Sequence, residues 1–423
     1  MILPLALNLL ASLSNVTAPQ PSVPPLLDDL QHRAVRFFWE HSNPHNGFTK
    51  DRARNSDAAP PNNIASSASV GFALSAYVIG TERHWLDRTQ ALNRTRITLK
   101  NLMTTWPHQK GWLYHFVDYN TGVRAWKCEA STIDTSICFA GVIVAEQYWK
   151  DPQITKDAEA FAKRMDWNFV VKDGGLLPES TTVSMGWHPE SGFINARWNN
   201  WDELKMIYVQ GYGFSDMSTD GWAKIERPYV NYKGIEMLAG GPLFMHEMSE
   251  SFYDFKGLRD PLGYNYWVES RNAALGNRQY CIDNPKHFAA YGPNFWGLSA
   301  CDVPDGYAAR GAPGYIDDDG TITPTSAVAA IQFAPDLAIS FAKTIRKEHP
   351  EAWGRYGFPN GYNPSKNWVD SDVIGIDLGM MLTAVENFRS GLIARLSMSN
   401  PKIRRGFSRL GFKLGADDVL QAK

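Results

Sequence analysis

Residues 66–79 read Ser-Ser-Ala-Ser-Val-Gly-Phe-Ala-Leu-Ser-Ala-Tyr-Val-Ile, and this stretch decides the predicted fold. It is rich in Ala, Ser and Gly and carries no charge, so it predicts a helix that is tightly packed on all sides. The next segment, at about 86–103, gathers its charges on one side and predicts an amphipathic helix that covers the first from outside. An inner and an outer helix therefore follow one another along the chain.

The same alternation recurs in the rest of the sequence. Apolar segments rich in small residues predict further inner helices at 131–148, 202–212, 241–255, 324–331 and 376–396. Amphipathic or charged segments predict outer helices at 28–42, 154–169, 221–226, 264–280 and 335–347. Six inner helices within six outer ones predict an all-α fold, the (α/α)6 barrel.

The loops ahead of the inner helices should then meet at one end of the barrel. We expect this rim, which would form the cleft, to consist of the loops 43–64, 107–130, 178–200, 284–323 and 357–375. Strands should be limited to small hairpins, such as one at 112–117. A single barrel domain is predicted at 28–412, between an apolar N-terminal segment with a Pro-rich linker at 1–27 and a tail at 413–423.

Composition excludes several classes of function. The 42 Lys and Arg nearly balance the 44 Asp and Glu, so nucleic-acid binding has no electrostatic support. The apolar start is too short to span a membrane. It resembles the core of a signal peptide but lacks a basic start, so the expected location is periplasmic or secreted. Metal-ligand spacing is absent around the four cysteines, which we expect to be free and buried, although disulfides remain an alternative.

Carboxylates near the predicted rim are the candidate catalytic groups, because a carboxylic acid and an opposing carboxylate can act together as a general acid and a base. Asp134, Glu203 and Asp377 each fall in the first turn of a predicted inner helix, and those turns should converge on one axis. Glu129 and Glu190 lie in loops of the same rim. Helix capping is the alternative for Asp134, and a favourable helix dipole is the alternative for Glu203.

Aromatic residues are abundant, with 15 Trp, 17 Tyr and 21 Phe. Flat rings in Gly- and Pro-rich loops suit a cleft that stacks on sugar faces, although anchoring of the loops would also account for many of them. The predicted substrate-binding residues are Trp187, His188, Tyr212, His246, Tyr291, Trp296 and Trp368.

Two other clusters predict structure rather than chemistry. His246, Glu247 and Glu250 share one segment but do not form a zinc-protease motif, so a structural or substrate-contacting role is favoured over a metal. Residues 317–320, Asp-Asp-Asp-Gly, lack the ligand alternation and the closing Glu of a calcium loop, and therefore predict a turn.

Several of these loops resemble one known family. Glu-Ala-Ser-Thr-Ile-Asp-Thr at 129–135 and Gly-Trp-His-Pro-Glu-Ser-Gly-Phe at 186–193 are similar to segments of the glucoamylase-like glycoside hydrolases, in particular the bacterial endo-β-1,2-glucanases of glycoside hydrolase family 144. Further similar stretches lie at 241–246, 291–300, 317–325 and 353–358. Together they span about residues 28 to 412.

The resemblance implies an (α/α)6 barrel, no metal or other cofactor, and a carboxylic acid as proton donor. By position, Glu203 matches that acid, and Asp134 or Asp377 would be the opposing carboxylate. Glu247 departs from the family, where a neutral residue is expected, and this puts the length of the substrate and products in doubt.

The predicted function is endo-acting hydrolysis of a β-1,2-glucan by a monomer whose partner is an oligo- or polysaccharide. The alternatives are a transglycosylase or an exo-acting hydrolase on the same scaffold, or a sugar-binding protein without catalysis.

Overall fold

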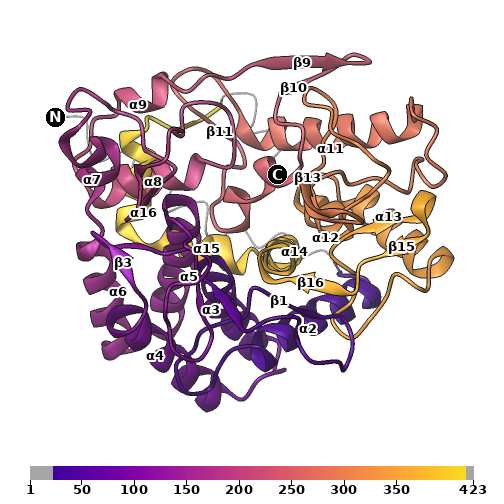
Figure 1. Cartoon of the computed structure of the whole chain (residues 1–423). Coiled ribbons are helices and arrows are strands. Elements are labelled where there is room, and N and C mark those ends of the chain that lie inside the picture. Colours follow the sequence, from indigo (N-terminus) through magenta and orange to yellow (C-terminus); the bar gives the residue numbers. More distant parts are fainter. Residues whose placement is uncertain (1–21, 416–423) are drawn as a thin grey trace.

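The computed structural model describes residues 22–415, so the predictions for the apolar start and most of the tail lie outside the described residues. Within this range no helix is long and apolar enough to cross a membrane. The fold is rich in helices, and α14 (Gly375–Ser390) is seen end-on near the middle of Figure 1.

The stretch at 66–79 forms most of α3 (Ser67–Glu82), in which residues 67–81 are all buried. It packs closely on α5 (Thr132–Trp149), which is also buried for most of its length. A Cβ added at Gly141 would lie 2.0 Å from the carbonyl oxygen of Gly71. The small residues are therefore needed because the backbones of the two helices touch.

Contacts between neighbours lead from one buried helix to the next. α3 also contacts α14, α14 contacts α12 (Pro324–Ala329), and α12 contacts α10 (Phe244–Glu247). On the other side, α5 contacts α8 (Lys205–Phe214). The Lys205–Glu250 ion pair then links α8 to the short helix η3 (Ser249–Ser251), which follows α10.

Further helices lie around these. They are α2 (Pro25–Glu40), α4 (Arg88–Thr104), α6 (Pro152–Arg164), α7 (Trp167–Val171), α9 (Asp220–Ala223), α11 (Tyr266–Asp283), α13 (Pro335–Glu348), α15 (Leu392–Ser399) and α16 (Pro401–Arg409). The remaining 3-10 turns are η2 (Asp173–Gly175), η4 (Ala330–Gln332) and η5 (Pro364–Lys366). On α6 and α13 the buried side chains keep to one face, as expected for covering helices.

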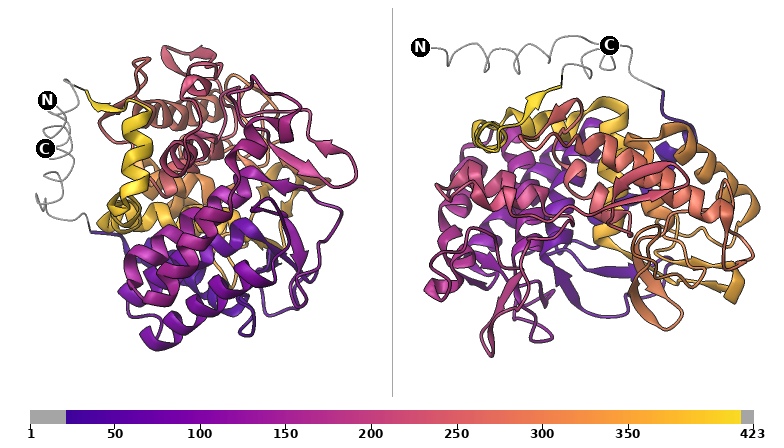
Figure 2. Two further views of the ribbon diagram at one scale, coloured as in Figure 1. Left: turned by 90° about the vertical axis from the view of Figure 1, so that its left-hand side faces the viewer. Right: turned by 90° about the horizontal axis from the view of Figure 1, so that it is seen from above.

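Short antiparallel strands tie the long loops together. β1 (Arg52–Arg54) pairs with β16 (Asp372–Ile374), β2 (Ile64–Ser66) with β5 (Phe116–Asp118), and β6 (Ala130–Ser131) with β7 (Gly186–His188), which also pairs with β8 (Gly192–Phe193). Each of the first three pairings joins two of the predicted rim loops. In the right-hand view of Figure 2, hairpins and long loops gather along the lower edge, and the C-terminal helices lie along the upper edge.

The other strands form separate pairs. They are β3 (His108–Gln109) with β4 (Trp112–Leu113), β9 (Tyr229–Tyr232) with β10 (Ile235–Leu238), β11 (Leu258–Arg259) with β17 (Lys413–Leu414), β12 (Ala300–Val303) with β13 (Gly306–Ala309), and β14 (Tyr362–Asn363) with β15 (Trp368–Val369). Because β17 pairs with β11, ordered structure continues two residues beyond the predicted boundary at 412.

Several predicted helix boundaries were wrong. α2 begins at Pro25 rather than Asp28, since proline is well suited to a first helical position. The segment 241–255 holds only α10 and η3 rather than one long helix. The predicted helix at 376–396 is interrupted at Gly391, whose φ of 64° ends α14 before α15 begins.

Candidate active site

Three of the predicted carboxylates come together where α5, α8 and α14 begin. Asp134 and Asp377 occupy the first turns of α5 and α14, and both are buried. Glu203 lies two residues before α8, not in its first turn as predicted. The charges of Asp134 and Asp377 both act on Glu203. The starts of three separate buried helices thus supply one group of acids.

Glu203 is the acid whose surroundings most strongly favour a proton. Its Oε2 atom is buried and has no hydrogen-bond partner among the described residues. Burial, together with the charges of Asp202, Asp134 and Asp377, raises the pKa of Glu203 well above its usual value. Burial also raises the pKa of Asp202, to about 6. These surroundings therefore favour the protonated form of Glu203, which is the form that a general acid needs.

Asp377 titrates near neutrality. Burial raises its pKa to about 7, with Asp302 and Asp51 adding to the shift. Asn360 opposes this by donating a 2.6 Å hydrogen bond from Nδ2 to Oδ2 of Asp377. The other oxygen, Oδ1, accepts no hydrogen bond from a described protein group. Asp377 can therefore offer one free carboxylate oxygen to a water molecule.

Asp134 combines a capping role with a place in the acid group. Its backbone N–H donates to Ser131 Oγ at 3.2 Å, which is the predicted N-cap contact. Ser131 Oγ in turn donates to Asp134 Oδ2 at 2.5 Å. Asp134 Oδ1 faces His115 Nε2 at 3.3 Å. Asp134 can therefore both cap α5 and belong to the group of acids. Both of its carboxylate oxygens contact protein groups.

Glu129 is joined to the same group through His115. Nδ1 of His115 lies 3.0 Å from Glu129 Oε1. Burial works to raise the pKa of Glu129, but the hydrogen bond and charge of His115 outweigh it and lower the pKa. Donor atoms of His115, Glu129 and Asp134 lie within 4.8 Å of one another, a spacing that one metal ion could bridge. The same spacing is accounted for by a charged His115 between two carboxylates.

Glu190 is paired with Arg124 rather than with the other acids, which argues against its prediction as a catalytic candidate. It projects from the β7–β8 hairpin, where its side chain is half exposed and receives two hydrogen bonds from Arg124, at 2.6 and 3.0 Å. The Arg124 hydrogen bond lowers the pKa of Glu190 to about 2. A carboxylate held ionised in this way cannot donate a proton at neutral pH.

The predicted sugar contacts divide into two sets. Trp187, His188 and Trp368 are partly exposed on the rim strands β7 and β15. Nδ1 of His188 faces the Lys127 carbonyl at 3.2 Å, which leaves its other ring nitrogen available. These three residues remain candidates for contact with a sugar.

Tyr212, His246, Tyr291 and Trp296 are buried, so the structure does not support a cleft position for them. Tyr212 packs near the far end of α8, against Tyr208, and its hydroxyl points to the Thr219 carbonyl. Trp296 packs on the outer helix α13 through Phe341. Tyr291 and Trp296 were predicted in the cleft because they lie in a loop, but both of these loop rings pack into the core.

Tyr307 is a rim residue that the sequence analysis missed. It lies opposite Asp302 in the β12–β13 pair, and cross-strand partners project from the same face of a hairpin. Asp302 in turn bonds to Arg52 at 2.7 Å. Burial of the hydroxyl and the charge of Asp377 raise the pKa of Tyr307, although 58% of the residue is exposed. The turn sequence Pro-Asp-Gly at 304–306 was the signal that could have revealed this hairpin.

Glu247 and Glu250 are interior groups rather than cleft residues. Glu250 forms a buried 2.8 Å ion pair with Lys205. Glu247 accepts a 2.6 Å hydrogen bond from Ser326 Oγ, and burial raises its pKa well above the usual value. All four cysteines are likewise buried and free, as expected.

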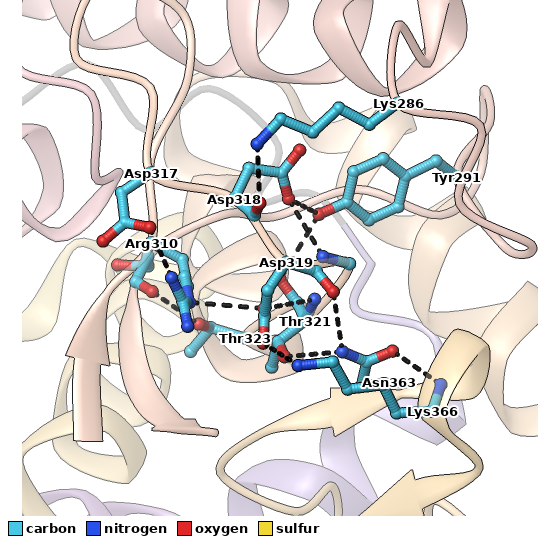
Figure 3. A network of polar contacts seen from close by, with 12 residues as sticks. Lys286, Tyr291, Arg310, Asp317, Asp318, Asp319, Thr321, Thr323, Asn363 and Lys366 are labelled. Atoms are coloured by element: carbon cyan, nitrogen blue, oxygen red, sulfur yellow. Dashed lines mark hydrogen bonds and ion pairs between the residues drawn. The ribbon is translucent and has the colours of Figure 1, made fainter. Parts of the chain in front are cut away.

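The Asp-Asp-Asp-Gly segment forms a turn, as predicted, and side-chain contacts hold it in place (Figure 3). Asp318 accepts hydrogen bonds from the hydroxyls of Tyr280 and Tyr291 and from the Gly320 N–H. Asp319 is paired with Lys366 at 2.9 Å.

Comparison with known proteins shows which family this chain resembles. Residues 195–401, which include Glu203 and Asp377, match the model of the family described as "Putative glucoamylase". Over this segment the chain is similar to the glucoamylase-like family. A Bacteroides fragilis protein described in the same words as that family has a solved structure with a TM-score of 0.85 and 27% identity, covering 94% of this chain and 99% of that one.

Two further relatives of this glucoamylase-like protein have named activities. The endo-beta-1,2-glucanase from Chitinophaga pinensis, solved with sophorotriose and glucose, has a TM-score of 0.84 and 25% identity over 93% of this chain and 99% of that one. The exo beta-1,2-glucooligosaccharide sophorohydrolase (non-reducing end) of Parabacteroides distasonis is 27% identical over 431 residues, or 91% of this chain. The chain spans 57% of the length of that curated relative.

Proposed function

We propose that this glucoamylase-like protein hydrolyses β-1,2-glucan, cutting within the polymer and releasing sophoro-oligosaccharides. The observation that carries the proposal is the raised pKa of the buried Glu203 beside Asp134 and Asp377. A protonated carboxylic acid close to a second carboxylate is the equipment that glycoside hydrolysis requires. The names of the Chitinophaga and Parabacteroides relatives support β-1,2-linked glucose as the substrate class.

In the proposed reaction, Glu203 protonates the leaving glycosidic oxygen. Asp377 accepts a proton from the attacking water, since its Oδ1 is free and its pKa of about 7 suits a base near neutral pH. Asp134 contributes its negative charge beside Glu203 rather than binding the water, because both of its oxygens already contact protein groups. Tyr307, Trp187 and Trp368 would contact the sugar chain.

We further propose that the buried and covering helices form an (α/α)6 barrel, with the paired loops at its catalytic rim. The circuit of contacts through α3, α5, α8, η3, α12 and α14 supports this arrangement. We also propose that the enzyme is exported, acts as a monomer and uses no metal.

Incubation with linear β-1,2-glucan tests the function directly, by following reducing ends and product lengths together. We expect rapid shortening of the polymer and a mixture of sophoro-oligosaccharides. Sophorose as the sole early product would indicate exo action instead. Redistribution of chain lengths without new reducing ends would indicate a transglycosylase, and no turnover of any glucan would leave a sugar-binding protein.

A further inference from the structure

His115 lies between Glu129 and Asp134 but has no role in the proposed reaction so far. Its backbone is fixed on both sides, because its N–H donates to the Glu129 carbonyl at 2.9 Å and its carbonyl accepts from Ser67 N–H at the start of α3. Its ring stacks on Phe116, with centroids 3.7 Å apart and planes 15° apart. The imidazole is therefore held in one orientation.

Both nitrogens of this ring face carboxylates. Nδ1 lies 3.0 Å from Glu129 Oε1, and Nε2 lies 3.3 Å from Asp134 Oδ1. A neutral imidazole has only one N–H, so it could donate to one of the two oxygens and would turn a lone pair toward the other. A doubly protonated ring satisfies both contacts.

The charges around the ring favour that form. Glu129 reaches it from the segment before β6, Asp134 from α5, and Asp51 from the loop before β1. Arg52 pairs with Asp51 at 3.2 Å, and His188 on β7 acts on the Glu129 side. Burial opposes a charge on His115, but the charges of Asp134, Glu129 and Asp51 together raise its pKa to about 9.

The ring thus distinguishes two neighbouring acids. Asp134 faces a cation and also accepts from Ser131, whereas Glu203 Oε2 has no hydrogen-bond partner among the described residues. When two carboxylates influence one another, a proton resides on the acid whose charge is less well stabilised. That acid is Glu203.

We propose that His115 is a positioning residue: its imidazolium bridges Glu129 and Asp134 and thereby directs the shared proton of the acid group to Glu203. The consequence for catalysis rests on the proposed glycosidase function, but the charge state of the ring does not. His115 acts through Asp134 and need not touch the substrate.

Ring-nitrogen NMR of the ¹⁵N-histidine-labelled full chain tests the charge state without any substrate. The signals missing in His115→Gln assign the ring. We expect both nitrogens to be protonated at pH 7.5 and to titrate near pH 9. Titration at or below the ordinary value of about 6.5 would overturn the proposal, even if the protein proved to be an active glucanase.

Kinetics of His115→Gln then test the positioning role. Glutamine keeps a donor but cannot carry the charge, so we expect kcat on β-1,2-glucan to fall by about tenfold or more at pH 7, with KM changed less than about twofold. The cationic form of His115 exists below its pKa of about 9, so the wild type should lose activity as pH rises through that value. In the variant the fall in activity at high pH should no longer follow the His115 pKa, although Glu203 must still be protonated for activity.

His108→Gln is the matched control, because His108 is exposed on the neighbouring β3–β4 hairpin and bonds to Gly111 N–H rather than to an acid. It should keep the wild-type pH profile. An unchanged kcat in His115→Gln, or a fall without any change in the profile, would contradict the positioning role. Wild-type activity that EDTA abolishes and a divalent ion restores would also overturn it, in favour of a metal site.

Discussion

The turn at 317–320 and the group formed by Asp134, Glu203 and Asp377 differ in how their carboxylates are stabilised. In the turn at 317–320 every aspartate has a protein partner, such as the two tyrosine hydroxyls on Asp318 and the Lys366 ammonium group on Asp319. In the acid group, Glu203 Oε2 has no partner among the described residues, and Asp377 receives only the amide of Asn360. The turn uses its acids to fix the chain.

The difference shows that the supply of donors, rather than the number of acids, distinguishes a structural cluster from a reactive one. Lys366 and the Thr321 N–H help to lower the pKa of Asp319 against the effect of its burial. Burial and neighbouring carboxylates raise the pKa values of Glu203 and Asp377. Buried carboxyls that lie among other carboxylates keep their protons to a higher pH than exposed ones do.

The largest expected effect is that of Glu203→Gln, which keeps the shape but removes the proton. We expect kcat on the glucan to fall by about 10²–10⁴-fold. An aryl glycoside with a good leaving group, if accepted, should recover much of this loss, since it needs little protonation. Glu190→Gln, which removes a half-exposed, Arg-paired acid of the same loops, should change kcat by less than about threefold. If the two variants behaved alike, the contrast between paired and unpartnered acids would fail.

Asp377→Asn removes the proposed base and should lower kcat by about 10²-fold or more. The pH profile provides an independent measurement. Because the base must be ionised, activity should fall as pH drops below the Asp377 pKa of about 7, while Glu203, with its raised pKa, stays protonated. Full activity of the wild type at pH 5 would remove Asp377 from the base role.

Asp318→Ala tests the structural side of the comparison. It leaves the hydroxyls of Tyr280 and Tyr291 and the Gly320 N–H without their buried acceptor. The free energy of unfolding should fall by about 2–4 kcal/mol, while kcat at a permissive temperature stays near that of the wild type. Denaturant unfolding and the rate are measured on the same preparation. A large loss of kcat without any loss of stability would place this turn among the reactive acids.

The smallest effect is expected for the partly exposed aromatic ring of Trp187. Trp187→Ala should weaken substrate binding by about 1–3 kcal/mol and raise KM, with little change in stability. Trp296→Ala is the contrasting variant. Since Trp296 is fully buried, its truncation should cost about 3–5 kcal/mol of stability instead. An unchanged KM in Trp187→Ala would remove that ring from the binding surface.

The sequence by itself determined the alternation of buried and covering helices. Small residues such as Gly71 and Gly141 mark where two helix backbones touch, and this requirement is local enough to read from composition. It also placed Asp134 and Asp377 correctly at helix starts, because capping and first-turn preferences depend on nearby residues. Helix ends were less predictable where tertiary packing breaks a helix, as at α10 and η3.

Only the tertiary structure decided which acid holds a proton and which aromatic ring is exposed. Glu190 and Glu203 look alike in the sequence, but Arg124 reaches one of them from another loop, and the other is surrounded by carboxylates. Trp187 and Trp296 both lie in Gly-rich loops, yet only Trp296 is covered by an outer helix. Charge and burial depend on distances between residues far apart in the chain, and those distances exist only once the chain has folded.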